Sequence, residues 1–177
     1  MRSPPTLYIR PAIDEDAAAI SAIRVAAWQR AYQDFMPHDY LANLNLTANL
    51  AMLAAQLNKQ SRDFNVSVAQ YTKEVIGFLI LGQPRFATSE TTVELWALNI
   101  APDYWRMGIA SKLITHAINN AKTQFNCISL WCIKGNIPAL ACYQRQGFTA
   151  SGQERSSTHL TGHNLVEIEF ILPLGNL

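Results

Sequence analysis

The sequence predicts an α/β protein built around a mixed β-sheet, and three observations support this prediction. Segments with strand-like and helix-like patterns alternate along the chain. The apolar run at 127–133 is nearly unbroken, as in a parallel strand that is covered on both faces. The segment 93–111, VELWALNIAPDYWRMGIAS, passes from a strand through a glycine-bearing turn into a helix. Two parallel strands joined by that helix form a right-handed crossover.

The first half of the chain is expected to supply one strand, two helical regions and a hairpin. A strand at 6–10 precedes a helix for which Asp14 is the expected N-cap. A second helical region covers 38–59. Segments 64–71 and 75–82 then alternate as two strands joined by a tight turn.

The second half is expected to contain the crossover and a closing pair of strands. The strand 93–100 leads to a helix over 108–123, and the buried strand 127–133 leads to a helix over 137–146. Gly147 ends that helix, a strand begins at Phe148, and the last strand covers 165–172. The whole chain, 1–177, is expected to form a single domain.

Composition excludes several classes of protein. Of the 177 residues, 49% are hydrophobic and 15% charged, which is typical of a globular chain. The net charge of +1 and the lack of a Lys/Arg run argue against nucleic acid or an anionic membrane as partner. No apolar run approaches the ~20 residues of a membrane span, and the N-terminus lacks a secretory core. Cys127, Cys132 and Cys142 have no metal-ligand spacing, so we expect reduced thiols, no metal and a cytoplasmic location.

The turn that opens the helix at Gly108 is the first candidate site. The unpaired backbone N–H groups at a helix start converge on one point, with the positive end of the helix dipole behind them. Gly108 and Ala110 allow a phosphate to approach the backbone closely, and Arg106 adds a cation. The alternative is an ordinary turn between a strand and a helix.

The second candidate site lies about thirty residues later, in NIPALACYQRQGF. Asn136 follows the apolar strand, where its side chain could either reach a ligand or cap the next helix. Tyr143 lies seven residues on and shares a helix face with Asn136, either as a functional hydroxyl or as a core tyrosine.

Together these two segments resemble the GNAT superfamily of N-acetyltransferases. The family signature Q/R-x-x-G-x-G/A stands here as Trp105 to Ala110, with tryptophan in place of the usual Gln or Arg. The later pattern N-x-x-A-x-x-x-Y-x-x-x-G-F is met in full from Asn136 to Phe148. The match is close over 93–150 and rests on element order alone over 6–82.

The resemblance implies a fold and a co-substrate. The GNAT acyl-CoA N-acyltransferase fold is a mixed sheet of six to seven strands, with splayed fourth and fifth strands and about four flanking helices. Acetyl-CoA would lie between the splayed strands, with its pantetheine arm added like a further strand. The strand backbone would come from Leu98, Asn99 and Ile100, and Asn136 and Ala139 would flank the arm. The pyrophosphate would be held by Arg106, Met107, Gly108, Ile109, Ala110 and Ser111.

The resemblance also implies roles for two further groups. Glu94, fourteen residues before Gly108, matches the position of the catalytic base in part of the family; alternatively it only pairs with a nearby cation. Strict alternation would place it on one face with Trp96 and Leu98. Tyr143 matches the general acid that protonates the leaving thiolate.

Three functions remain open at this point. The first is an N-acetyltransferase that moves an acetyl group directly from acetyl-CoA to a primary amine, on a small molecule or a peptide. The second is a non-catalytic module with the same fold that senses acyl-CoA, and the third is a nucleotide site of another kind. Trp28 and Tyr32 would lie near the acceptor in the first case, unless they only pack in the core. A homodimer through a sheet edge or the last strand is compatible with the sequence.

Overall fold

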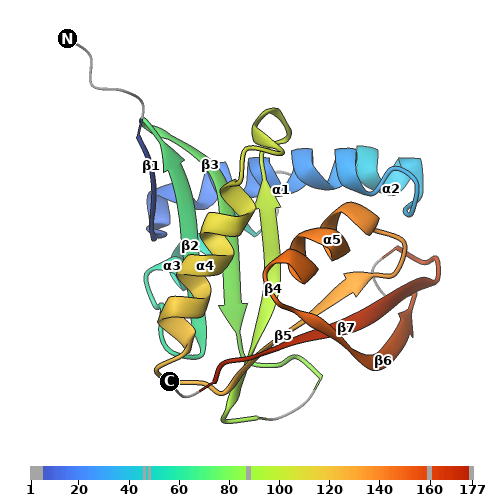
Figure 1. Cartoon of the computed structure of the whole chain (residues 1–177). Helices are drawn as coiled ribbons and strands as arrows, with labels where there is room; N and C mark the ends of the chain where they lie inside the picture. Colours follow the sequence, from blue (N-terminus) through green and yellow to red (C-terminus); the bar gives the residue numbers. More distant parts are fainter. Residues whose placement is uncertain (1–5, 46, 48, 87–88, 159–160, 176–177) are drawn as a thin grey trace.

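The computed structural model describes residues 6–45, 47, 49–86, 89–158 and 161–175 (Figure 1). These residues form one seven-stranded sheet in the order β1-β2-β3-β4-β5-β7-β6. The strands are β1 (Leu7–Pro11), β2 (Phe64–Tyr71), β3 (Glu74–Gly82), β4 (Thr92–Ile100), β5 (Cys127–Ile133), β6 (Thr149–Ser157) and β7 (Leu165–Pro173). The α-helices are α1 (Ala17–Ala31), α2 (His38–Ala42), α3 (Leu50–Leu57), α4 (Ile109–Ala121) and α5 (Ile137–Arg145), and η1 (Asp14–Asp16) and η2 (Pro102–Tyr104) are short 3₁₀ turns.

The order of strands and helices confirms the mixed sheet that the sequence predicts, with two differences in the helices. The helical region expected at 38–59 is split into α2 and α3, so five α-helices are described where about four were expected. Asn49 adopts a left-handed backbone (φ 64°) directly before α3, which no continuous helix tolerates. The cap expected at Asp14 is also wrong, because Asp14 opens η1 and α1 begins only at Ala17.

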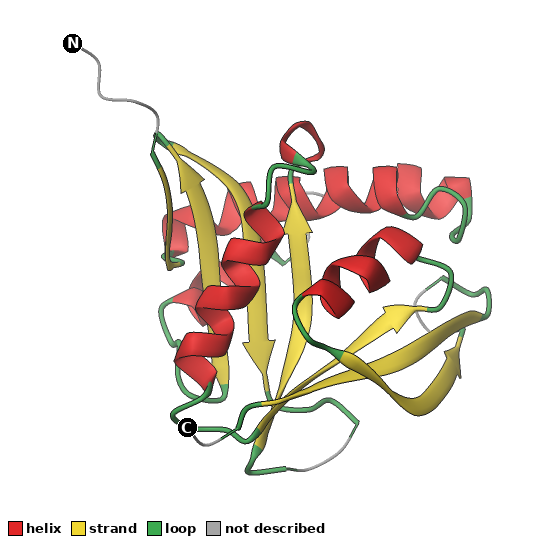
Figure 2. Ribbon diagram, viewed as in Figure 1, coloured by secondary structure: helices red, strands yellow, loops and turns green. Residues whose placement is uncertain are grey.

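Helices cover both faces of the sheet (Figures 1 and 2). On one face, α4 and α5 bury a core that includes Leu113 and Ile114, both with no exposed area. On the other face, α1 and α3 pack on β2 and β3 around Ile20 and Phe78. Burying each such side chain contributes about 1.5–3 kcal/mol. The two cores hold helices against both faces of the sheet around β4, the strand that borders the candidate site.

A β-bulge in β4 changes which side chains share a face. Leu81 pairs with Leu95 and Ile80 with Ala97, so Trp96 is the extra residue between them. Trp96 and Ala97 therefore both lie on the α1 side, whereas Leu98 packs on the α4 side. The expectation that Glu94, Trp96 and Leu98 share a face is wrong for Leu98, because a bulge breaks the period of two.

The described residues provide neither a membrane span nor a metal cluster. None of the described helices is long and apolar enough to cross a membrane. The described His, Cys, Asp and Glu side chains do not come together in threes that could hold a metal ion. The cysteines are free thiols, and burial raises the pKa of Cys127 and Cys142 and that of Cys132 to about 12. Thiols held protonated in this way are poor nucleophiles.

Candidate active site

The sheet opens between β4 and β5. The two strands pair in parallel over only four residues each, ending at Leu95 and Leu130. Beyond this point β4 continues to Ile100, while β5 turns away and pairs along its whole length with β7. Figure 1 shows the strands diverging, with α5 beside the opening. The splay that the sequence resemblance implied is therefore present.

The backbone of β4 presents hydrogen-bonding groups to this opening. The N–H of Ala101 donates to the carbonyl of Ile76 in β3 at 2.8 Å. Because backbone groups alternate between the two edges of a strand, Asn99 also faces β3, and Leu98 and Ile100 face the opening. Of the three residues whose backbone was expected to pair with the pantetheine arm, Leu98 and Ile100 face the opening and Asn99 does not.

Trp105 ties the turn after β4 to the end of that strand. Its indole Nε1 donates to the carbonyl of Ile100 at 2.7 Å, and its side chain is partly exposed. The tryptophan that replaces the usual Gln or Arg therefore has a structural role here. It occupies the Ile100 carbonyl and leaves the Ile100 N–H and both Leu98 groups facing the opening.

The turn before α4 has the geometry of an anion-binding loop. Arg106 (φ 64°) and Gly108 (φ 76°) both adopt the left-handed backbone, and Gly108 is the N-cap of α4. No side chain caps this end of the helix. The N–H groups of Ile109, Ala110 and Ser111 precede the first intrahelical bond, from Lys112 to Gly108, at 3.2 Å. A Cβ on Gly108 would meet no heavy atom within 4 Å, so the space next to these donors is empty of protein. Met107 beside them is largely exposed.

Asn136 and Ala139 form the start of α5, on the other side of the opening. Asn136 is buried and its side-chain oxygen accepts a hydrogen bond from the Ala139 N–H at 3.4 Å. The capping interpretation of Asn136 is therefore confirmed. Contact with a ligand stays a prediction for both residues.

Tyr143, the residue expected to act as the general acid, is buried. It lies in α5 and packs edge-on against Phe148, with ring centroids 5.9 Å apart. Burial raises its pKa well above 10, and electrostatic interactions with Cys132 and Tyr32 add to the shift. Burial likewise raises the pKa of Tyr32 to about 12. Tyr32 is the C-cap of α1, which lies on the opposite face of the sheet from α5.

Glu94 is almost completely buried, with 1% of its surface exposed. Its Oε1 accepts hydrogen bonds from Nε and Nη2 of Arg85, at 2.9 and 2.6 Å. Its Oε2 accepts one from the backbone N–H of Arg85, at 2.7 Å. The ion-pair alternative for Glu94 is thus present in the structure. The sequence offered no signal for Arg85, because it lies in an irregular loop with no periodic relation to Glu94.

Trp28 and Tyr32, near the end of α1, lie on the face of the sheet that α1 covers. Trp28 and Tyr32 contact each other edge to face, with centroids 5.4 Å apart. Both are only partly buried, and they pack beside a small cluster that includes Ile133 of β5 and Leu165 of β7. Their side chains are therefore partly in the core and partly at the surface. This is compatible both with packing in the core and with contact to an acceptor.

Arg155 lies on the same face of the sheet and stacks on aromatic rings there, which the sequence pattern did not indicate. Arg155 of β6 lies between the rings of Phe86 and Trp131, at 3.9 and 4.3 Å from the centroids. Its Nε donates to Glu167 of β7 at 2.7 Å. Its Nη1 is buried without a hydrogen-bond partner among the described residues. The pattern of β6 is polar throughout, so no sequence signal distinguished this arginine from a solvated one.

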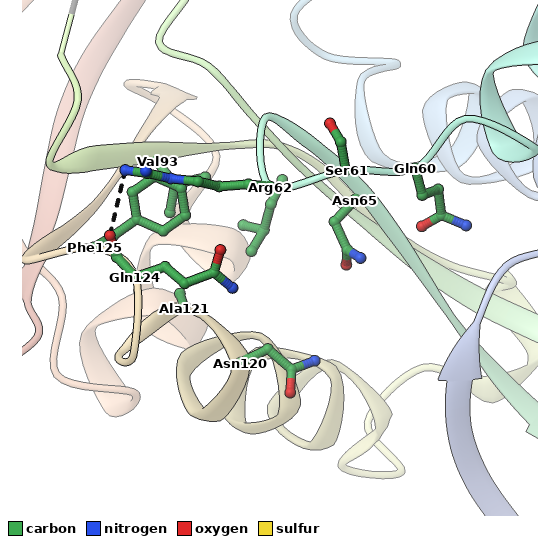
Figure 3. Close-up of a pocket in the computed structure, with 10 residues that line it drawn as sticks. Gln60, Ser61, Arg62, Asn65, Val93, Asn120, Ala121, Gln124 and Phe125 are labelled. Atoms are coloured by element: carbon green, nitrogen blue, oxygen red, sulfur yellow. Dashed lines mark hydrogen bonds between the residues drawn. The ribbon is translucent and has the colours of Figure 1, made fainter.

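A separate cavity of about 280 Å³ lies at the far end of α4 (Figure 3). Arg62 reaches across it, stacks on Phe125 at 4.7 Å and donates to the carbonyl of Gln124 at 3.4 Å. Asn120 and Ala121, which also line it, stand about 18 Å along the helix from Gly108, at 1.5 Å per residue. The cavity is therefore distinct from the opening between β4 and β5.

Comparison with known proteins agrees with this arrangement. The model of the Acetyltransferase (GNAT) family matches residues 17–148. A sequence search of curated proteins found no significant match. The structure is similar to PaiA N-acetyltransferase from Thermoplasma acidophilum in complex with coenzyme A, with 18% identity, a TM-score of 0.74 and coverage of 93% of this chain and 98% of that one.

Two further solved structures show the same fold. YncA, a putative acetyltransferase from Salmonella typhimurium with its cofactor acetyl-CoA, is 20% identical, with a TM-score of 0.74 and coverage of 97% of this chain and 96% of that one. Ribosomal-protein-alanine N-acetyltransferase from Brucella melitensis is 21% identical, with a TM-score of 0.73 and coverage of 94% and 99%. The sheet splits between β4 and β5, a glycine turn follows β4, and the family model matches most of the chain. This chain therefore belongs to the GNAT family of acetyltransferases.

Proposed function

We propose that this protein transfers an acetyl group from acetyl-CoA to a primary amine carried by a small molecule or a peptide. The observation that supports the proposal most directly is the opening between β4 and β5, bordered by free backbone donors at Leu98 and at the Gly108 turn. The solved structures with coenzyme A and acetyl-CoA have the same fold. The residues present suit the coenzyme, because the empty space at Gly108 lies next to unpaired N–H groups.

The coenzyme would be held mainly by main-chain groups. The N–H groups from Arg106 to Ser111 would bind its pyrophosphate, with the Arg106 guanidinium as counter-ion. The pantetheine arm would pair with Leu98 and Ile100, and Asn136 and Ala139 would border it from α5. The Leu98 or Ile100 N–H would polarise the thioester carbonyl. Acetyl-CoA supplies the activated acyl group when it is bound.

Two side chains would move the protons of the reaction. Glu94 would take a proton from the acceptor ammonium, so that the amine nitrogen can form a bond to the carbonyl carbon. The carbon–sulfur bond then breaks, and the thiolate leaves next to Tyr143. The Tyr143 hydroxyl is protonated at neutral pH and would donate to the leaving sulfur, although its raised pKa makes it a weaker acid than a free tyrosine. The nitrogen then loses its second proton, which replaces the one that Tyr143 gives to the sulfur, and Glu94 releases the first proton to solvent. The products are the amide, free coenzyme A and one proton.

An amine-panel screen that follows release of free thiol tests the proposal. We expect at least one amine to be acetylated by the wild type, and Glu94→Gln to lower kcat about 10²–10⁴-fold. Tyr143→Phe should lower kcat while coenzyme binding persists. Glu154→Gln and Tyr8→Phe are matched controls, because both side chains are exposed or half exposed and lie outside the proposed site.

The rival function, a non-catalytic acyl-CoA sensor, predicts a different outcome. Such a protein would bind coenzyme A in calorimetry but release no thiol with any amine in the panel. Tight binding of ATP without binding of coenzyme A would contradict both functions and favour a nucleotide site of another kind. A homodimer, checked by light scattering at several protein concentrations, would be consistent with the acetyltransferase and with the sensor alike.

A further inference from the structure

We propose that Arg85 is a positioning residue that orients the Glu94 carboxylate for proton transfer. This inference rests on the proposed function, in which Glu94 accepts the proton of the acceptor amine. It concerns the loop between β3 and β4, which neither the sequence motifs nor the coenzyme site includes. Among the described residues, Arg85 donates each of the hydrogen bonds that the Glu94 carboxylate accepts.

The hydrogen bonds that Glu94 accepts from described residues fill three positions of its carboxylate. A carboxylate has about four lone-pair positions. Arg85 fills two on Oε1 with its guanidinium and one on Oε2 with its backbone N–H. The remaining position, on Oε2, can accept a proton from an amine or from a water molecule. Because the guanidinium and the backbone N–H of Arg85 hold the carboxylate, the described residues leave only this one position on Oε2 to accept a proton.

The guanidinium of Arg85 is itself held in place. It lies 5.9 Å from the ring centroids of both Trp96 and Phe86, within the range of a cation–π contact. The Trp96 indole is fixed in turn, because its Nε1 donates to the carbonyl of Gln83 at 2.9 Å. The Arg85 side chain is 41% exposed and that of Glu94 1%, so Arg85 covers the carboxylate toward solvent.

Few other charged groups compete for Glu94. Its partners in register are Gly82 of β3 and Ser129 of β5, which do not titrate at accessible pH. On the same face of the sheet lie Arg155 of β6, Glu167 and Glu169 of β7, and Tyr32 of α1. Arg155 is paired with Glu167, and Glu169 accepts a hydrogen bond from Ser151. Of the charged groups on the described residues, Arg85 is the one bonded directly to Glu94.

The proton step balances without any further reactant. The N–H bond of the ammonium breaks and its proton joins Oε2 of Glu94, while the nitrogen keeps the electron pair that attacks the thioester. After the acetyl group has moved, Glu94 returns its proton to solvent. Arg85 takes no part in the proton transfer itself and keeps the carboxylate in position.

The pH dependence of kcat at saturating amine and acetyl-CoA tests this role. In Arg85→Gln the acidic limb of the pH profile should move upward, because the carboxylate loses the guanidinium hydrogen bonds and the adjacent positive charge. At a fixed pH on that limb, kcat should fall about tenfold for every pH unit by which the limb has moved. Arg85→Lys keeps the charge but not the fork, so its limb should move upward by less than that of Arg85→Gln.

Arg10→Gln is the matched control. Arg10 also donates two guanidinium bonds to a buried carboxylate, that of Asp16, at 2.6 and 2.8 Å, and the Ile13 N–H adds a third at 2.9 Å. Arg10 lies in β1, an edge strand of the sheet, three strands away from β4. Arg10→Gln should lower the melting temperature and leave the acidic limb where it is in the wild type.

The outcomes separate this inference from the proposed function. If Glu94→Gln is inactive and both Arg85 variants keep the wild-type limb, Glu94 acts as the base and the inference about Arg85 is wrong. If Glu94→Gln keeps the wild-type activity and limb, the assignment of the base fails and the inference fails with it. Coenzyme binding by calorimetry confirms that each variant is folded. Should Arg85→Gln not fold, an unchanged limb in Arg85→Lys overturns the inference.

Discussion

Replacing Gly108 by alanine should separate coenzyme binding from folding. Gly108 has a φ of 76°, and a Cβ there would meet no heavy atom within 4 Å. The cost to the fold is therefore the left-handed backbone alone, about 1–2 kcal/mol. For a chain of this size, each kcal/mol lowers the melting temperature by about 2–4 °C, so we expect a fall of roughly 2–8 °C.

The effect on coenzyme binding should be larger than the effect on stability implies. The added methyl group would occupy the space through which a phosphate reaches the first N–H groups of α4. Losing one charge-assisted hydrogen bond to the phosphate costs about 1.5–3 kcal/mol. That corresponds to a Kd for coenzyme A that is about 10–100-fold weaker. Calorimetry gives the Kd, and circular dichroism during heating gives the melting temperature.

Gly162→Ala provides the control for this experiment. Gly162 has a φ of 74° and equally empty surroundings, but it lies in the loop between β6 and β7. Both variants should lose similar stability, and only Gly108→Ala should lose affinity. Equal Kd values for Gly108→Ala and the wild type would refute the reasoning, because the coenzyme would then not approach this turn.

Two further predictions concern stability. The pKa of Tyr32 is about 12 in the folded chain against 10.0 for an unperturbed tyrosine, so the unfolded state loses its proton first and stability falls as pH rises from 10 to about 12. Tyr32→Phe removes this contribution and should flatten the alkaline decline of the urea midpoint; an unchanged decline would contradict it. In Gly82→Ala the Cβ would lie 2.3 Å from ring atoms of Trp96, and we expect a loss of about 1–3 kcal/mol in urea unfolding. A midpoint equal to that of the wild type would show that the indole moves aside freely.

Most of the strands were predictable because they are short apolar or alternating runs between turn residues, whereas β6 is polar. The strand 127–133 has the bounds that its apolar run indicates. The helix after Gly108 was predictable because the small residues of the turn mark its start. Local patterns of this kind are set by neighbours in the sequence, and a single sequence contains them.

The remaining features depend on contacts between distant segments. The bulge at Trp96 follows from the packing of its indole over Gly82, which alternation alone cannot reveal. The ion pair of Glu94 needs a loop to fold back over the strand. The electrostatic environment of Tyr143, which includes Cys132 and Tyr32, depends on elements that are far apart in the sequence. For the candidate site, the motifs therefore indicated which residues to consider, and tertiary packing supplied their partners.

The narrow junction of four residue pairs between β4 and β5 has a mechanical consequence. It divides the sheet into two panels, β1–β4 and β5–β7–β6, that are linked laterally at one end only. Twisting of one panel against the other is thus the softest deformation that this architecture allows. A coenzyme bound between the two panels would restrict this motion. We therefore expect amide hydrogens along the free edge of β4 to exchange more slowly once the coenzyme is bound.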